Sequence, residues 1–120
     1  MEESKRQKQV AGVILEEMND IFLRMGLNMI DGGMVSIAGV KVTPDLLEAR
    51  IYLSLFQVSN PSVAMGRLED RKSELRKELG LRVKQQLRRV PELRFFRDDT
   101  LDHVFKMEEI FKKINEEKGQ

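Results

Sequence analysis

The stretch ARIYLSLF at residues 49–56 constrains the fold more than any other part of the sequence. Its apolar side chains occupy every second position, which is the period of a β-strand with one buried face. The run MVSIAGVKV at residues 34–42 also alternates, but its phase shifts by one residue, which predicts a β-bulge at Gly39. With the connector 43–46 between them, these runs predict two antiparallel strands. Their apolar face has to be covered by other elements.

The residues before these strands are typical of an amphipathic helix. Over residues 5–25, apolar side chains recur at three- and four-residue steps, and Glu16, Glu17 and Asp20 fall off that stripe. Gly26 marks the expected end of the helix. The cluster Asp31-Gly32-Gly33 then predicts a turn that leads into the first strand.

A second helix is expected after the strands. Asn60 followed by Pro61 is typical of an N-cap and a first helical residue, and the helical spacing of apolar residues continues to about Arg88. Gly80 is a helix-weakening residue in the second half of this long segment, and Leu81 lies away from the apolar stripe. These two residues predict a kink or a break near Gly80.

The remaining elements complete a single domain. Residues 93–97 predict a third strand, and Asp99 or Thr100 can cap a final helix. The expected order is α-β-β-α-α-β-α, which is an α+β arrangement of two layers with helices on one face of a three-stranded sheet. We expect one domain over residues 1–120, with its core in residues 5–115 and a frayed end at residues 116–120.

Basic side chains are concentrated in one part of a nearly neutral chain. Residues 67–97 hold eleven Lys and Arg against five Asp and Glu, a net charge of +6. The net charge is −2 for residues 1–66 and −3 for residues 98–120. A solvated helix face is the simplest interpretation of such a run, and a phosphate-binding surface is the functional one.

Helical geometry places part of this charge on one surface. At about 100° per residue, Lys77, Lys84 and Arg88 lie opposite the apolar stripe of the second helix. Because Arg94 and Arg97 follow on the third strand, we expect a continuous basic surface across helix and strand. Lys and Arg side chains on such a surface would bind the phosphates of a folded nucleic acid.

The sequence excludes several other classes of protein. It has no cysteine, its first residues are charged, and no run of about twenty apolar residues occurs, so we expect a cytoplasmic protein without disulfides or a membrane span. No phosphate-binding glycine loop is present, and His103 lacks the partners of a catalytic triad. Asp98, Asp99 and Asp102 fit a turn and a helix cap better than a cation site. We therefore expect no enzymatic activity, no metal and no cofactor.

The two phenylalanines of the third strand have two interpretations. Phe95 and Phe96 lie on opposite faces of a strand, so at least one belongs to the core. Stacking of Phe96 on a nucleobase is the less favoured interpretation, because the chain has few aromatic residues and no aromatic-rich motif.

Three segments resemble the ribosome-binding factor A family, and the resemblance covers nearly the whole chain. VPELRFFRDDTLD at residues 90–102 is similar to the proline, strand and acidic turn of that family, and VSIAGVKVTPDLLEARIYLSLF at residues 35–56 is similar to its paired strands. Arg6 and Val10, leading into ILEEMNDIF, resemble its first helix. In that family a small-residue kink joins the two central helices. Here either Ser73-Glu74-Leu75 or Gly80 would supply the kink.

The resemblance implies a type II KH-like fold and a monomeric RNA-binding factor of the small ribosomal subunit. It implies binding to the rRNA of that subunit and a role in late rRNA maturation, including that of the 5′ end. It also implies that the protein supports growth in the cold and that other assembly factors are possible partners. The alternative is a protein-interaction module that uses the same basic face without touching rRNA. The candidate rRNA-binding residues are Arg6, Lys8, Arg76, Lys77, Arg82, Lys84, Arg88, Arg89, Arg94 and Arg97.

Overall fold

The first helix, α1, spans Lys5–Arg24 and begins with a reciprocal cap. The Ser4 hydroxyl accepts a hydrogen bond from the Gln7 backbone N–H at 3.1 Å, and the Gln7 side chain accepts one from the Ser4 N–H at 2.8 Å. The Gln7 amide also donates to the Val42 carbonyl at 2.8 Å, which ties the start of α1 to the sheet. The helix ends at Arg24, and Gly26 follows with φ +71°, as its sequence predicts. The structure is a computed structural model and describes residues 3–98.

Over residues 3–98 the sheet has four strands, so the prediction of three was wrong. The order is β1-β2-β3-β4, with β1 at Met29–Ile30, β2 at Gly33–Val42, β3 at Glu48–Phe56 and β4 at Glu92–Arg97. β2 is antiparallel to β1 and β3, and β4 is parallel to β3. Strand β1 escaped prediction because two residues are too few to show alternation.

A tight turn joins β1 to β2. Asp31 and Gly32 both have positive φ, at 51° and 78°, which is the geometry of a two-residue hairpin turn. The next residue, Gly33, lies against the far end of β3: a Cβ atom there would be 2.6 Å from the backbone of Gln57 and of Phe56. Only glycine fits at this contact.

We predict that Gly33→Ala lowers the free energy of unfolding by about 3 kcal/mol, because strand backbone has to move to admit the methyl group. Gly12→Ala is the control: it adds the same methyl group on α1, where nothing lies within 4 Å, and should stabilise by about 1 kcal/mol. Urea unfolding measures both changes. An unchanged unfolding midpoint for Gly33→Ala would contradict the close contact.

The predicted bulge is confirmed. Ile37 is paired with Leu53 and Gly39 with Tyr52, so Ala38 is an extra residue on β2. Before the bulge Ile37 is buried, and after it Val42 is buried on the same side of the sheet. The bulge therefore corrects the phase shift that the sequence shows.

The long second helix is broken, but not where the sequence predicts. Asn60 caps α2 by accepting a hydrogen bond from the Val63 N–H at 3.2 Å, and α2 spans Pro61–Asp70. A separate helix, α3, spans Lys72–Val83, and the break lies at Arg71. Neither Gly80 nor the Ser73 segment forms it.

Gly80 lies inside α3 and serves packing instead. A Cβ atom at Gly80 would lie 3.2 Å from a methyl group of Val90, so the glycine allows the segment before β4 to lie close to the helix. The prediction that the helix reaches Arg88 was also wrong. α3 ends at Val83, and a turn follows in which the N–H groups of Gln86 and Leu87 both bond to the Val83 carbonyl at 2.8 Å.

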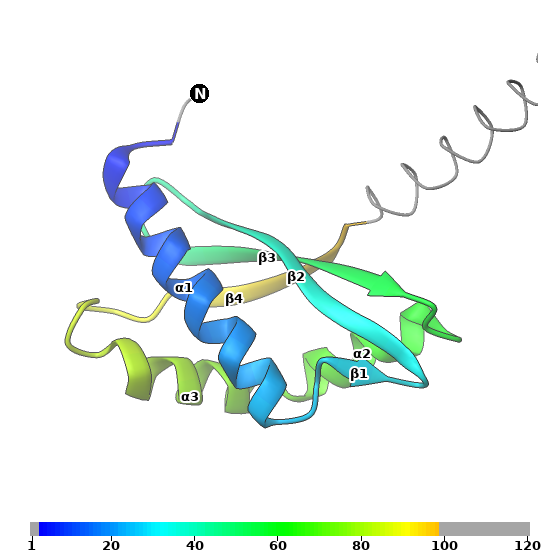
Figure 1. The fold of residues 1–120 in the computed structure, drawn as a ribbon. Coiled ribbons are helices and arrows are strands. Elements are labelled where there is room, and N and C mark those ends of the chain that lie inside the picture. The colour runs from blue at the N-terminus through cyan, green and yellow to red at the C-terminus, as the bar shows by residue number, and fades with distance from the viewer. Residues whose placement is uncertain (1–2, 99–120) are drawn as a thin grey trace, which may run out of the picture.

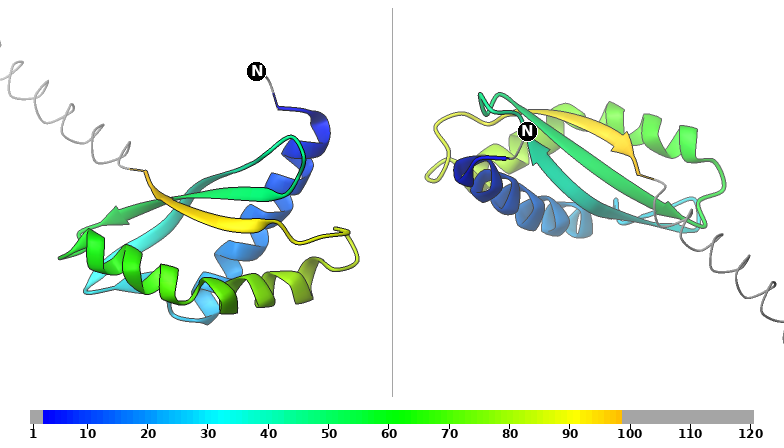
Figure 2. Two further views of the ribbon diagram at one scale, coloured as in Figure 1. Left: turned by 180° about the vertical axis from the view of Figure 1, so that it is seen from behind. Right: turned by 90° about the horizontal axis from the view of Figure 1, so that it is seen from above.

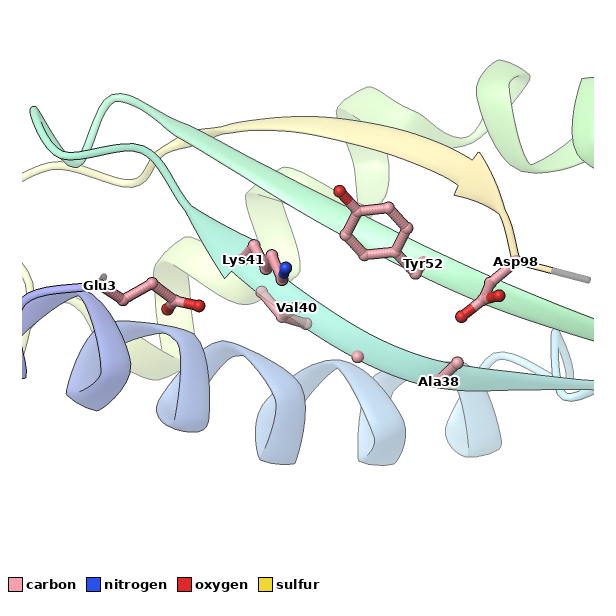
Figure 3. Close-up of a pocket in the computed structure, with 7 residues that line it drawn as sticks. Glu3, Ala38, Val40, Lys41, Tyr52 and Asp98 are labelled. Carbon is pink, nitrogen blue, oxygen red and sulfur yellow. The ribbon is translucent and has the colours of Figure 1, made fainter. Parts of the chain in front are cut away.

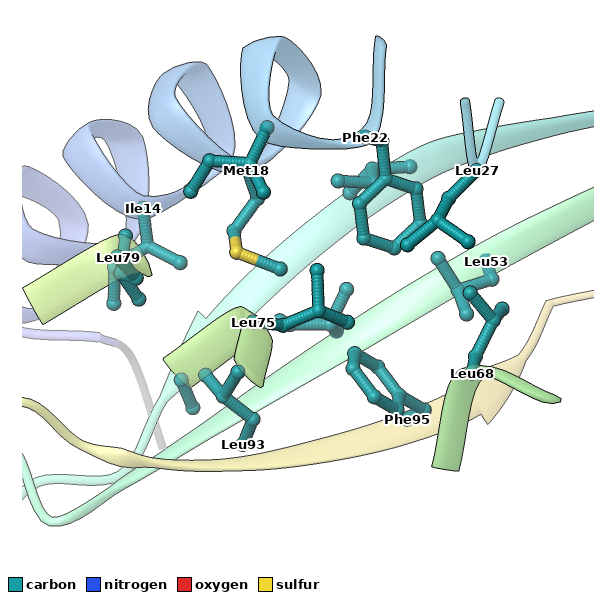
Figure 4. Close-up of a cluster of buried hydrophobic side chains, with 14 of the residues drawn as sticks. Ile14, Met18, Phe22, Leu27, Leu53, Leu68, Leu75, Leu79, Leu93 and Phe95 are labelled. Atoms are coloured by element: carbon teal, nitrogen blue, oxygen red, sulfur yellow. The ribbon is translucent and has the colours of Figure 1, made fainter. Parts of the chain in front are cut away.

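The helices cover one face of the sheet, and no element within residues 3–98 covers the other face, which we call the open face (Figures 1 and 2). The core between the layers is shown in Figure 4 and includes the fully buried side chains of Ile14, Met18, Leu68, Leu75 and Leu79. These side chains meet the inward residues of the strands, such as Leu53 and Leu93. The predicted α+β arrangement in two layers is therefore confirmed. The predicted final helix and frayed end lie outside the described residues.

Candidate nucleic-acid interface

Four of the candidate residues gather where α1 begins and α3 ends. Arg88 and Arg89 are exposed in the loop between α3 and β4, and Lys84 is exposed at the start of that loop. The Arg6 guanidinium of α1 donates to the Gln86 carbonyl in the same loop at 3.5 Å. We call Arg6, Lys84, Arg88 and Arg89 the loop cluster.

The loop cluster borders a hollow of about 330 Å³. Arg6, Arg88 and Arg89 contribute to its wall, together with Leu87 and Pro91. Leu87 is 7% exposed and Pro91 is fully buried, so they anchor the loop in the core. The arginines are thus presented by a segment whose apolar side chains hold it in place.

Arg76 fixes the same loop from the side of α3. Its guanidinium donates to the carbonyls of Pro91 at 3.2 Å and Val90 at 2.8 Å. Lys77 is exposed beside it, at a hollow to which Gly80 also contributes. Arg76 therefore positions the loop, and Lys77 extends the basic surface along α3.

Arg82 faces α1, where acidic side chains neutralise it. Its Nη1 atom lies 2.6 Å from the Asp20 carboxylate and 3.2 Å from that of Glu17. The hydrogen bond from Arg82, with a second one from Arg24, lowers the pKa of Asp20 below its ordinary value of 3.8. The same pairing raises the pKa of Arg82. Arg82 connects the two helices rather than presenting a free charge.

This pairing gives a prediction for pH dependence. Because folding lowers the pKa of Asp20, its pairing stabilises the fold above pH 3.8 and this contribution is lost as the pH falls through the lowered value. Arg82→Met should raise the pKa of Asp20 toward 3.8. Arg24→Met is the control and should raise it less. An NMR titration of the Asp20 carboxyl carbon measures both, and a larger rise in Arg24→Met would contradict the assignment.

Arg94 does not extend the helix surface, so it is not part of the predicted continuous basic surface. Arg94 projects from the face of β4 opposite to Leu93 and Phe95, which are in the core, and its Nε lies 2.8 Å from Glu48. It is therefore on the open face of the sheet, whereas α3 covers the other face. Arg97 is exposed at the end of β4.

Two further cations share the open face with Arg94, and the sequence reasoning missed them. Lys41 is paired with Arg50 across β2 and β3, and Arg50 is paired with Arg94 across β3 and β4. All three are exposed and form one row near the β2–β3 connector. Their alternation with buried neighbours was visible in the sequence, but their alignment depends on the strand register.

Lys8 is exposed on the first turns of α1, close in sequence to Arg6. Within residues 3–98, no group of three or more His, Cys, Asp or Glu side chains could hold a metal ion. Over the same residues, no helix has the length and apolar character needed to cross a membrane. His103, Asp99 and Asp102 lie outside the described part of the chain.

Comparison with known proteins gives consistent matches. The sequence model of a family described as Ribosome-binding factor A matches residues 6–111. The ribosome-binding factor A of Cytophaga hutchinsonii is 38% identical over 112 residues, which are 93% of this chain and 84% of that protein.

Two structures are similar in fold. The crystal structure of ribosome-binding factor A from Thermus thermophilus has a TM-score of 0.64 at 16% identity, over 76% of this chain and 94% of that one. A homology model of the Thermus thermophilus factor, fitted into a cryo-EM map of a 30S complex, has a TM-score of 0.61 at 17% identity. It covers 82% of this chain and 97% of that one.

Proposed function

The chain belongs to the ribosome-binding factor A family, and on this premise we propose that it binds the small ribosomal subunit by contacting its rRNA. A structural relative was fitted into a map of a 30S complex, which supports the small subunit as the partner. The protein would act in the cytoplasm as a monomer. It would act by binding alone, without catalysis or a cofactor.

The loop cluster is the observation that carries this proposal. Its side chains extend from a loop that Arg76, Leu87 and Pro91 hold in place, so their positions are set before binding. Arginines around one hollow can contact successive phosphates of a folded RNA, and each contact releases counterions. Lys8 and Lys77 would extend the contact along α1 and α3, and we leave Arg82 out of it.

We propose that the fold is KH-like of type II. Apart from the two-residue β1, the order is α-β-β-α-α-β with β4 parallel to β3, which supports this assignment. The junction of α2 and α3 differs from a glycine loop, since Arg71 there is paired with Glu74 and Lys72 with Glu69. These carboxylates compensate the cations of the junction, so we assign RNA contact to the loop cluster instead.

The resulting role is to hold small-subunit rRNA in one conformation during late maturation, including formation of the 5′ end, alongside other assembly factors. Cells that lack the protein should accumulate small-subunit rRNA with an unprocessed 5′ end, most strongly in the cold. Primer extension measures this. Rescue by the wild type but not by a Lys84→Ala, Arg88→Ala, Arg89→Ala variant would support the role, and equal rescue would contradict it.

The alternative function, docking on a protein through the basic face, has a direct test. Binding to rRNA stripped of ribosomal proteins should persist if phosphates are the target, and it should weaken steeply as salt rises. Loss of all binding on stripped rRNA, with retention on intact subunits, would favour the protein partner.

A further inference from the structure

The open face of the sheet has an aromatic pair at its centre. Tyr52 of β3 and Phe96 of β4 are in register, and their rings stack with centroids 5.5 Å apart and planes at 26°. Tyr52 is half-buried and Phe96 is 38% exposed. Phe95 is in the core, as expected for one of the two neighbouring phenylalanines, whereas Phe96 is available on the surface.

A hollow of about 390 Å³ lies beside Tyr52 (Figure 3). On β2 the residue paired with Tyr52 is Gly39, and no atom lies within 4 Å of the position that a Cβ would take there. The missing side chain leaves one side of the tyrosine ring accessible. Lys41 is at one end of the hollow, and Asp98 and Glu3 also contribute to its wall.

The row of cations described above lies next to the aromatic pair. Glu48 contacts Arg94 at 2.8 Å through one carboxylate oxygen and Arg50 at 3.3 Å through the other. One carboxylate thus orients two guanidinium groups. Because the row holds three cations, Lys41, Arg50 and Arg94, it keeps a positive net charge. The Arg94 side chain remains 65% exposed, so it can bind an anion as well.

We propose that unpaired RNA nucleotides bind to this open face, with their bases stacked on Tyr52 and Phe96 and their phosphates on Lys41, Arg50 and Arg94. Every base has a π-face, so aromatic platforms beside cations bind single strands with little sequence preference. Asp98 and Glu3 repel phosphate, so the backbone runs on the side of the cations. The inference rests on the proposed function and adds a second surface to the loop cluster.

The intrinsic fluorescence of Tyr52 can report on binding at this site. Tyr52 is the only tyrosine, and the sequence has no tryptophan. Titration of the full-length protein with a ten-nucleotide oligouridylate should quench the Tyr52 fluorescence until the site is saturated. The same titration of free tyrosine corrects for light that the oligonucleotide absorbs. Duplex RNA of equal phosphate content should quench it much less, because its bases are already stacked. Equal quenching by duplex and single strand would overturn the proposal.

Variants locate the contact. Phe96→Leu should weaken binding of a fluorescent oligouridylate about tenfold in an anisotropy titration. Phe56→Leu is the matched control, since Phe56 is exposed at the end of β3 far from the cations, and its binding should stay unchanged. Equal affinities of Phe96→Leu and the wild type would overturn the proposal. The proposal would also be overturned if acrylamide failed to quench the Tyr52 fluorescence of the RNA-free protein, because the open face would then already be covered.

The same samples separate this inference from the proposed function. Retention on small subunits that depends on Lys84, Arg88 and Arg89, with no response of Tyr52 to single strands, would leave the function standing and refute the second surface. Quenching of Tyr52 without any retention on small subunits would support the second surface and refute the function.

Discussion

Truncation of Leu75 to alanine should lower the free energy of unfolding by about 3 kcal/mol. Leu75 is fully buried on α3, between the other helices and β4 (Figure 4). The substitution removes its contacts and leaves a cavity that close-packed neighbours fill only in part. A domain of this size has a total stability of about 5–15 kcal/mol, so the loss is a large fraction of it.

The control for this prediction is Leu81→Ala. Leu81 lies on the same helix and undergoes the same chemical change, but it is 58% exposed, so the effect should stay within about 0.5 kcal/mol. Urea unfolding of both variants gives the comparison. Equal destabilisation by the two substitutions would contradict the assigned core face of α3.

Replacement of Lys84, Arg88 and Arg89 by alanine should weaken binding to small-subunit rRNA by about 30-fold near physiological salt. These side chains are exposed, so their removal should leave the fold stable. Each lost phosphate contact also lowers the salt dependence. The slope of log K against log salt should therefore become less steep by about 2. Filter binding over a salt series measures both quantities.

A variant of equal charge provides the control. Arg24, Arg67 and Arg71 lie at the other end of the molecule, where α1 ends and β1 begins, and their exposed ion pairs contribute little to stability. Their replacement by alanine gives the same net charge as the loop-cluster variant. If both variants lose affinity equally, overall charge drives binding and the loop cluster has no special role.

Local chemistry made much of the fold predictable. The cap at Asn60 and the bulge beside Gly39 each depend on a few neighbouring residues, and both were found from the sequence. Strand β1 was missed because its two residues become a strand only by pairing across the turn at Asp31. The helix break at Arg71 was also missed, since no proline or glycine marks it.

The candidate site was harder to predict, because it depends on which layer carries each cation. Arg82 was among the candidate rRNA-binding residues, but the acidic side chains that neutralise it come from α1, more than sixty residues earlier. Arg94 was grouped with the helix residues although strand alternation puts it on the opposite face of the sheet. Lys41 and Arg50 join it only through the strand register.

Co-sedimentation with isolated ribosomal subunits over a salt series tests the central claim most directly, with the wild type beside the loop-cluster variant and its charge-matched control. The account predicts retention of the wild type and the control on the small subunit but not on the large one. Retention should fall as salt rises, and the loop-cluster variant should lose it first. Equal retention of all three proteins on the small subunit, or equal binding of the wild type to both subunits, would contradict the account.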